Sequence, residues 1–349
     1  QMIMFIFFAA ANAFAYAVAI GQHMEHDFLN LRYNIASNQY TKFISTFGNI
    51  NMYASYLSIS IPVLLAVFAF CKNWFSRILS GILLIAAGCN ILIANSDSVF
   101  LGIFAGVVVV TILAFMQGRL RYSSFAVFLL FVGNLVLGFI NKYGHTRYDK
   151  KRGGLAIALN RLDIAFVLCG AALLVFAVVC VCNWKLGTRV AAWNKKKIVL
   201  IVCGACVALG VIGIIVLAVT GSSLLTFNDK WGSYRGYIWR KIVEVYGDAP
   251  FVNKLFGYGN ESVRVTLKAA CYNEMVQVTG KVYDNAHNEL LQYLFTTGIV
   301  GLLSYLALVG SSIVYMFKHA KEHAWISVCL AATVGYFAQS ILNLNQPIT

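Results

Sequence analysis

Residues 283–291 join ionisable and amide side chains to the start of an apolar stretch that is long enough to cross a membrane. Chemistry at a membrane surface needs polar groups that are held at a fixed depth, and the start of a membrane-spanning helix can hold them there. We expect Asp284 or Asn285 to cap the helix that follows, which leaves His287 in its first turn, with Asn288 beside it as a candidate substrate-binding residue. There the free backbone N–H groups and the helix dipole favour a nearby anion. Interfacial His and Asn side chains that only finish a helix are the alternative.

Arg235 is the second candidate for charge chemistry. It opens residues 235–246, in which apolar side chains recur at helical spacing, namely Ile238, Trp239, Ile242, Val245 and Tyr246. Arg235 is therefore expected on the apolar side, whereas Arg240, Lys241, Glu244 and Asp248 are expected on a solvated face. A guanidinium that points toward the buried side needs an anionic or carbonyl partner. A bound anion and a salt bridge to a carboxylate of the same loop satisfy this need equally well.

Three other short segments are candidates for ligand contact. The turn around Tyr258 has a glycine on each side, which lets the backbone approach a ligand or another segment closely. Asn49 can hydrogen-bond sugar hydroxyls, although turn chemistry explains Gly48-Asn49 equally well. The basic loop 142–161 includes Arg152 and Arg161.

A metal site is the weakest of the candidates. Glu25-His26-Asp27 could hold a divalent ion, but two carboxylates separated by one residue are common on solvated surfaces. The spacing of the cysteines shows no zinc pattern. We therefore expect neither a metal ion nor a cofactor.

The composition shows which elements must position these residues. Apolar residues make up 60% of the chain and charged residues 11%, and the mean hydropathy is +0.75. These values are typical of an all-α, polytopic transmembrane bundle. We expect about nine spans within one membrane domain, residues 1–349, and the two ends suggest a piece of a longer protein. The expected spans are 1–20, 54–71, 77–95, 98–116, 123–141, 162–182, 197–219, 290–317 and 325–343.

The loop charges predict the orientation of these spans. Most lysines and arginines lie in short loops on one side, which is the cytoplasmic side by the positive-inside rule. The net charge of +14 therefore sets topology and does not indicate nucleic acid binding. The long loop 220–289 is then extracytoplasmic. The basic loop 142–161 breaks the rule, either because a span is miscounted or because the loop binds an anion, and we favour the second reading.

Taken together, these residues resemble the bacterial O-antigen ligase and O-antigen polymerase family of membrane glycosyltransferases. Three patterns carry the resemblance. The first is His287-Asn288 followed by Leu291, Gly298 and Gly301. The second is Arg235 with Trp239, Pro250 and Gly257-Tyr258-Gly259, and the third is Thr46-Phe47-Gly48-Asn49 with Asn51 and Tyr53. Asp97 departs from the family, which often has an arginine between two serines there.

The resemblance implies a GT-C-like fold and a metal-independent transfer in the bacterial inner membrane, with the site on the extracytoplasmic side. The donor would be a glycan on undecaprenyl diphosphate, and the acceptor a saccharide, a lipid-linked glycan or a protein. His287 would take or orient the acceptor proton, and the helix N-terminus would help to keep its imidazole neutral. Arg235, with Arg161 and Arg152 behind it, would stabilise the leaving diphosphate.

Two other classes of protein stay open. A transporter or flippase without chemistry is the main alternative, although such proteins usually carry ionisable residues at mid-span, where this sequence has few. A scaffold without activity is the other. Ligase and polymerase are not separated, because the two share a donor and differ in the acceptor.

Overall fold

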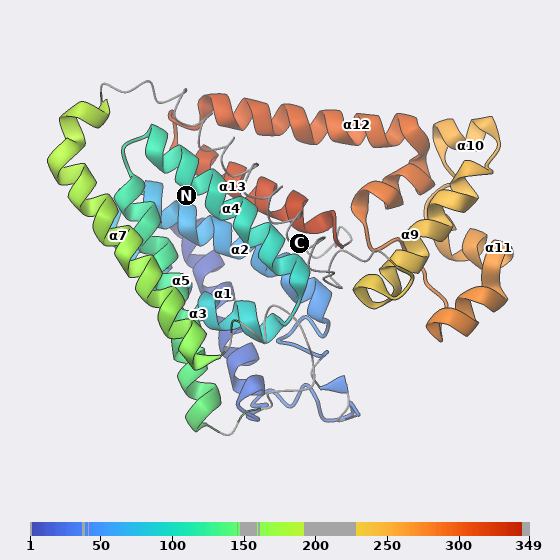
Figure 1. Ribbon diagram of the computed structural model, residues 1–349, viewed down its shortest axis with the longest axis horizontal. Helices are drawn as coiled ribbons and strands as arrows, with labels where there is room; N and C mark the ends of the chain where they lie inside the picture. Colours follow the sequence, from blue (N-terminus) through green and yellow to red (C-terminus); the bar gives the residue numbers. More distant parts are fainter. Residues whose placement is uncertain are drawn as a thin grey trace. The chain divides into compact units, whose positions relative to one another are not determined.

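The computed structural model describes residues 2–36, 39–40, 42–144, 146, 159, 161–191 and 228–343, with the backbone alone at 97 and 184–191. Within these residues the chain forms eleven helices and no strand (Figure 1). Seven of the helices are long and apolar enough to cross a membrane. The prediction of an all-α, polytopic membrane protein is therefore confirmed.

The expected spans agree with the helices to within a few residues. The seven membrane-spanning candidates are Met2–His23, Ile50–Phe70, Trp74–Ala94, Ser98–Met116, Leu120–Tyr143, Leu162–Asn183 and Glu289–His319. The expected span 325–343 is a shorter apolar helix, Ala324–Ser340. The expected span 197–219 lies outside the described residues.

The chain divides into two compact units. The first comprises Gln1–Trp193, Ile313–Gln339 and Gln346–Thr349, and the second comprises Asn194–Ser312 and Ser340–Asn345. A single membrane domain over residues 1–349 stays a prediction.

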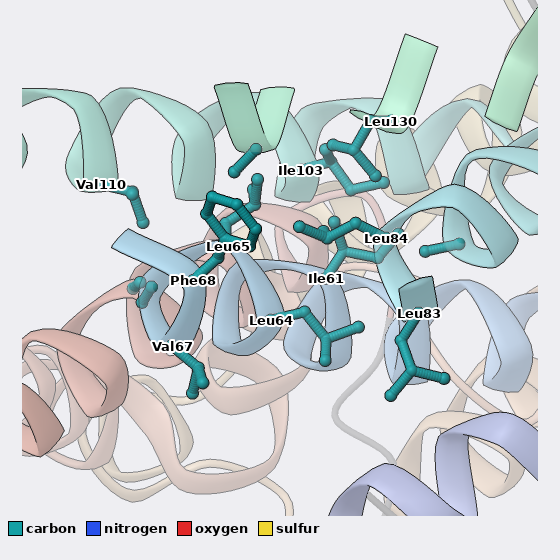
Figure 2. Close-up of a cluster of buried hydrophobic side chains, with 14 of the residues drawn as sticks. Ile61, Leu64, Leu65, Val67, Phe68, Leu83, Leu84, Ile103, Val110 and Leu130 are labelled. Carbon is teal, nitrogen blue, oxygen red and sulfur yellow. The ribbon is translucent and has the colours of Figure 1, made fainter. Parts of the chain in front are cut away.

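The first unit is a bundle of apolar helices around α2. Its complete helices are α1 (Met2–His23), α2 (Ile50–Phe70), α3 (Trp74–Ala94), α4 (Asp97–Met116), α5 (Leu120–Tyr143) and α7 (Leu162–Ala191). It also holds most of α13 (Ala324–Ser340). Helix α2 contacts α3, α4 and α5, and most of its side chains are buried. Figure 2 shows side chains of α2, including Leu65 and Phe68, among apolar side chains of the neighbouring helices.

Small residues bring two helices of this bundle into backbone contact. A Cβ atom on Gly88 of α3 would collide with the carbonyl group of Leu130, and one on Gly133 of α5 would collide with that of Ile85. In lipid, helix association depends on such close van der Waals packing, because the tails are as apolar as the side chains.

The second unit is a small helical assembly with its own core. It contains α9 (Trp231–Gly247), α10 (Phe251–Phe256), α11 (Ser262–Thr279) and residues 289–312 of α12 (Glu289–His319). Helix α9 contacts both α10 and α11. The buried hydrophobic side chains of this core are Tyr237, Ile238, Ile242, Val263, Leu267, Met275, Tyr283, Ala286 and Phe295. The segment expected as the long loop is therefore folded over its described part.

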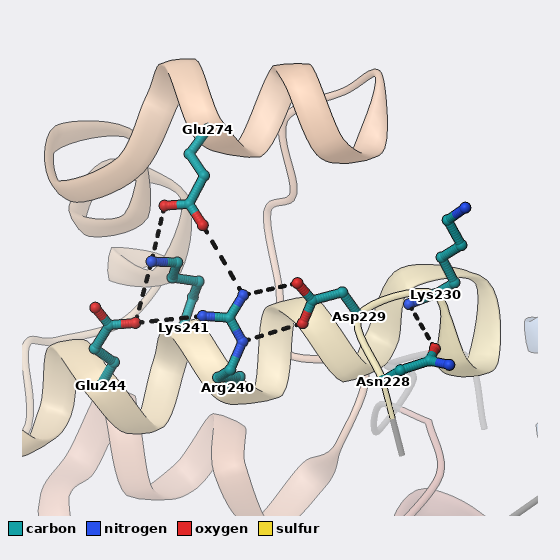
Figure 3. Close-up of polar contacts among 7 residues, drawn as sticks. All are labelled: Asn228, Asp229, Lys230, Arg240, Lys241, Glu244 and Glu274. Carbon is teal, nitrogen blue, oxygen red and sulfur yellow. Dashed lines mark hydrogen bonds and ion pairs between the residues drawn. The ribbon is translucent and has the colours of Figure 1, made fainter. Parts of the chain in front are cut away.

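The prediction that Lys241 lies on a solvated face of α9 is wrong. Its side chain is only 11% exposed, and its amine lies 2.8 Å from Glu274 of α11 and 3.1 Å from Glu244 (Figure 3). A lysine can bury its aliphatic stem while its charged head stays at the surface. The helical period alone does not show that α11 covers this part of α9.

Candidate active site

A glycine kink separates the first part of α12 from the rest of the helix. Gly298 has φ +69° and ψ −172°, a backbone conformation that is open essentially only to glycine. Residues 289–297 therefore form a short arm whose direction differs from that of the apolar helix that follows. The arm carries the polar segment 283–288 at its start.

The kink forms a clasp with the glycine-rich turn at residues 255–259. The N–H of Tyr258 donates to the carbonyl of Phe295 (2.9 Å), and the N–H of Gly259 donates to the carbonyl of Thr296 (2.9 Å). Gly257 has φ +77°, and a Cβ atom on Gly257 or Gly298 would collide with the backbone of the opposite segment. Glycine is therefore required at both positions for the same reason, because the two backbones are in close contact there.

His287 lies just before α12, so the expected helix start is wrong. The cap is Asn288, whose Oδ1 accepts from the N–H of Leu291 at 3.0 Å, and the helix begins at Glu289. Asn285, one of the two expected caps, instead accepts the N–H of His287 at 3.2 Å. This bond accompanies a left-handed backbone at His287, with φ +48°, which turns the chain before the helix can start.

The imidazole of His287 is kept neutral at physiological pH. Burial lowers its pKa to about 4, with further lowering by the positive charges of Arg235 and Lys281. Asp284 and a hydrogen bond with the Asn343 side chain oppose this shift. The expected neutral form therefore arises from burial and nearby cations, since His287 precedes the first helical turn. Within the described part of the chain, the buried Nδ1 has no hydrogen-bond partner.

The structure brings Arg235 to His287. The regular part of α9 begins at Arg235, after three residues with positive φ, residues 232–234. From there its charge acts on His287 and also on Tyr283, whose pKa is raised by burial and lowered by Arg235. The two residues predicted to be catalytic thus lie in one electrostatic environment, although they are far apart in sequence.

Three hydrogen bonds hold the His287 segment in place. The indole N–H of Trp239 donates to the carbonyl of Ala286 (2.8 Å), and the N–H of Ala286 donates to Oε1 of Gln292 (2.9 Å). The hydroxyl of Tyr283 donates to the carbonyl of Ser233 (3.0 Å). The segment is therefore fixed to both α9 and the arm of α12, which limits the positions open to the imidazole.

The other predicted site residues do not all lie in the same unit as His287. Tyr258 stacks on Phe295, with ring centroids 4.9 Å apart, and lies in the clasp. Asn49 and Arg161 belong to the first unit. Asn49 caps α2 through its side-chain oxygen, and Arg161 makes two hydrogen bonds to Asp163, the shorter 2.7 Å long. Arg152 lies outside the described residues. Substrate contacts at all of these residues stay predictions.

Three residues near His287 were not predicted. The ring of Tyr283 meets the imidazole edge to face at 6.0 Å, and Asn343 approaches it from beyond α13. Glu289 is buried, at 1% exposure. An acid in the first turn of a helix is usual, so the pattern does not indicate burial. No sequence pattern around Asn343 indicates that it lies near His287, because this contact depends on the path of the chain after α13.

A wide polar cleft adjoins this segment within the second unit. Its volume is about 1300 Å³. The lining residues are Tyr258, Asn260, Glu261, Ser262, Arg264, Val265, Thr266, Lys268, Ala269, Asp284, Asn285 and Gln292. Asn285 connects the cleft to the site, because its side chain holds the backbone of His287. Among the residues that the structure describes, no cluster of three or more His, Cys, Asp or Glu side chains could hold a metal ion.

The family model described as O-antigen ligase matches residues 152–306, which include α9, α10, α11, the clasp and His287. No curated protein matches the chain at a significant level.

Proposed function

Since the chain belongs to the O-antigen ligase family through residues 152–306, we propose that it transfers or polymerises a glycan from an undecaprenyl-diphosphate carrier onto an acceptor hydroxyl. The observation that carries this proposal is the neutral, half-buried imidazole of His287 in the field of Arg235. A base and a cation in one place suit a reaction that removes a proton from one oxygen and leaves negative charge on another.

In the proposed step the acceptor oxygen bonds to the anomeric carbon of the donor glycan. The bond between that carbon and the diphosphate oxygen breaks, and its electron pair leaves with the lipid diphosphate. The acceptor proton moves to the imidazole of His287. Arg235 stabilises the developing negative charge on the leaving group.

Donor binding prepares the base for this step. In the free protein the cations Arg235 and Lys281 disfavour protonation of His287. A bound diphosphate offsets their charge and raises the pKa of the imidazole toward the range in which a general base is most effective. The base thus becomes stronger when the leaving group is in place.

The remaining predicted contacts complete the proposal. Arg161 and Arg152 would supply further guanidinium groups to the diphosphate, and Asn49 would bond sugar hydroxyls. Asn288 and Tyr258 hold the arm and the turn beside the site. Arginines in place of a metal ion would make the transfer independent of divalent cations.

We place this chemistry at the extracytoplasmic face of the bacterial inner membrane. The support is the distribution of basic residues among the short loops, which favours an outside position for the segment that contains Arg235 and His287.

The test incubates the purified full-length protein with an undecaprenyl-diphosphate glycan and an acceptor glycan, in the presence of EDTA. We expect release of undecaprenyl diphosphate together with extension of the acceptor. Movement of the intact lipid-linked glycan across a bilayer, with no release, would contradict the proposal and favour a flippase. Loss of release in EDTA that magnesium restores would contradict metal independence alone.

A further inference from the structure

Helix α11 presents two basic side chains to the polar cleft. Val263 and Leu267 are fully buried and fix the helix on the core of the second unit. Arg264 and Lys268, each one residue further along, are exposed and line the cleft one helical turn apart. Their charges are therefore not needed to attach the helix.

Neither of these two cations forms an ion pair with a carboxylate of the residues that the structure describes. Within the described ranges of the chain, Arg264 and Lys268 make no hydrogen bond or ion pair, and the Lys268 amine lies 5.7 Å from the ring centroid of Tyr272. By contrast, Arg240 and Lys241 of α9 pair with acids of the same unit (Figure 3). The cleft also contains the carboxylates of Glu261 and Asp284. Among the described residues neither carboxylate forms an ion pair with Arg264 or Lys268, and that of Asp284 accepts a hydrogen bond from the Asn285 amide at 2.6 Å.

The rest of the lining suits a saccharide. Tyr258 offers an aromatic ring, and Asn260, Ser262 and Gln292 carry groups that exchange hydrogen bonds with hydroxyls. A volume of about 1300 Å³ exceeds the usual range for sites of drug-sized ligands, so that more than one sugar residue fits.

We propose that this cleft binds the saccharide next to the reacting centre and selects glycans that carry carboxylate or phosphate groups, through Arg264 and Lys268. The guanidinium fork of Arg264 matches either anion, and Lys268 adds a second charge one turn away. The proposal rests on the proposed function for the origin of the glycan, which is either the donor or the acceptor. Direct saccharide binding is measurable without transfer.

The test measures binding of tri-galacturonate to the purified full-length protein by calorimetry, with maltotriose as the neutral counterpart. We expect saturable binding of tri-galacturonate that weakens as salt is added, and weaker binding of maltotriose. The double variant Arg264→Gln/Lys268→Gln keeps good helix formers at exposed positions, so the fold is retained. We expect it to bind tri-galacturonate at least tenfold more weakly than the wild type.

A matched control removes the same charge elsewhere on the second unit. Lys230→Gln/Lys254→Gln lies outside the cleft lining and should bind tri-galacturonate as the wild type does. Equal binding by the wild type and Arg264→Gln/Lys268→Gln would overturn the proposal, as would an equal loss in the control variant.

Transfer kinetics then identify the source of the glycan. With acidic substrates, a rise in donor KM in Arg264→Gln/Lys268→Gln assigns the cleft to the donor glycan, and a rise in acceptor KM assigns it to the acceptor. Unchanged values of both would overturn the role of the cleft while leaving the proposed function intact. Charge-dependent binding without any transfer would leave the cleft intact and overturn the proposed function.

Discussion

Two helices of the second unit carry basic pairs of different kinds. On α9, Arg240 and Lys241 form ion pairs with Asp229, Glu244 and Glu274. The pKa of Asp229 is lowered by Arg240, and that of Lys241 is raised by Glu274. On α11, Arg264 and Lys268 face an open cleft and form no ion pair among the described residues. The sequence alone does not distinguish the two pairs, since each consists of one arginine and one lysine.

The difference separates charge that joins helices from charge that is available to a substrate. The α9 pair links two helices through acids of the same unit (Figure 3), whereas the α11 pair lies in a cleft beside His287. Arg235 is a third case, because its charge acts on His287. Substitutions of paired cations and of cations near the site should therefore have different effects on transfer.

The largest effect is expected for His287→Ala. Loss of a general base typically lowers the rate by about 10² to 10⁴. Membrane insertion should be retained, because the residue precedes the membrane-spanning part of α12. The measurement is release of undecaprenyl diphosphate by equal amounts of inserted protein. Near-normal release by the variant would reduce His287 to a residue that merely precedes the helix.

Gly298→Ala should weaken transfer by opening the clasp. An added Cβ atom meets the backbone of Leu255, and the positive φ adds strain of about 1–3 kcal/mol. We expect at least a tenfold loss of transfer and a lower Tm. Gly310→Ala in the same helix is the control, since nothing lies near its added Cβ atom. Equal transfer and equal Tm in the two variants would contradict a role of the clasp in transfer.

Arg235→Lys tests whether fork geometry matters as well as charge. We expect a rise in donor KM or a fall in kcat of about tenfold or more, because lysine does not reproduce a bidentate contact with phosphate. If Arg161 holds the same diphosphate, Arg161→Lys should also weaken donor use. The double variant should then lose less than the sum of the two single losses. Wild-type kinetics in either variant would remove that arginine from the site, and strict additivity would argue against a shared clamp.

Arg240→Lys makes the same substitution at an arginine that is paired with acids, and it should have the smallest effect on transfer. Its neighbours are acids of the same unit, and exposed ion pairs contribute about 0–1 kcal/mol. Transfer should stay within about twofold of the wild type, with at most a small fall in Tm. A loss of activity as large as that of Arg235→Lys would break the division between the two kinds of cation.

Much of this organisation could be predicted from local patterns. Apolar length predicts the spans, and the period of α9 predicts that Ile238 and Ile242 are buried. The predicted cap was wrong because Asp284, Asn285 and Asn288 are all good caps, and the left-handed turn at His287 decides among them.

Contacts between distant segments could not be predicted. The clasp joins residues 255–259 to 295–298, and a glycine pattern does not say which backbone approaches which. Likewise, helical spacing places Lys241 on a polar face but does not reveal the acid of α11 that covers it. Such contacts depend on the path of the chain between the segments.

The central claim is that His287 is a neutral base whose protonation depends on an anion beside Arg235. The direct measurement is an NMR titration of protein with labelled histidine, in which the signal of His287, one of six histidines, is identified by its loss in His287→Gln. The pKa should be about 4 in the free protein and clearly higher with bound undecaprenyl diphosphate. A value near 6.5 that does not change when the diphosphate is added would contradict the account.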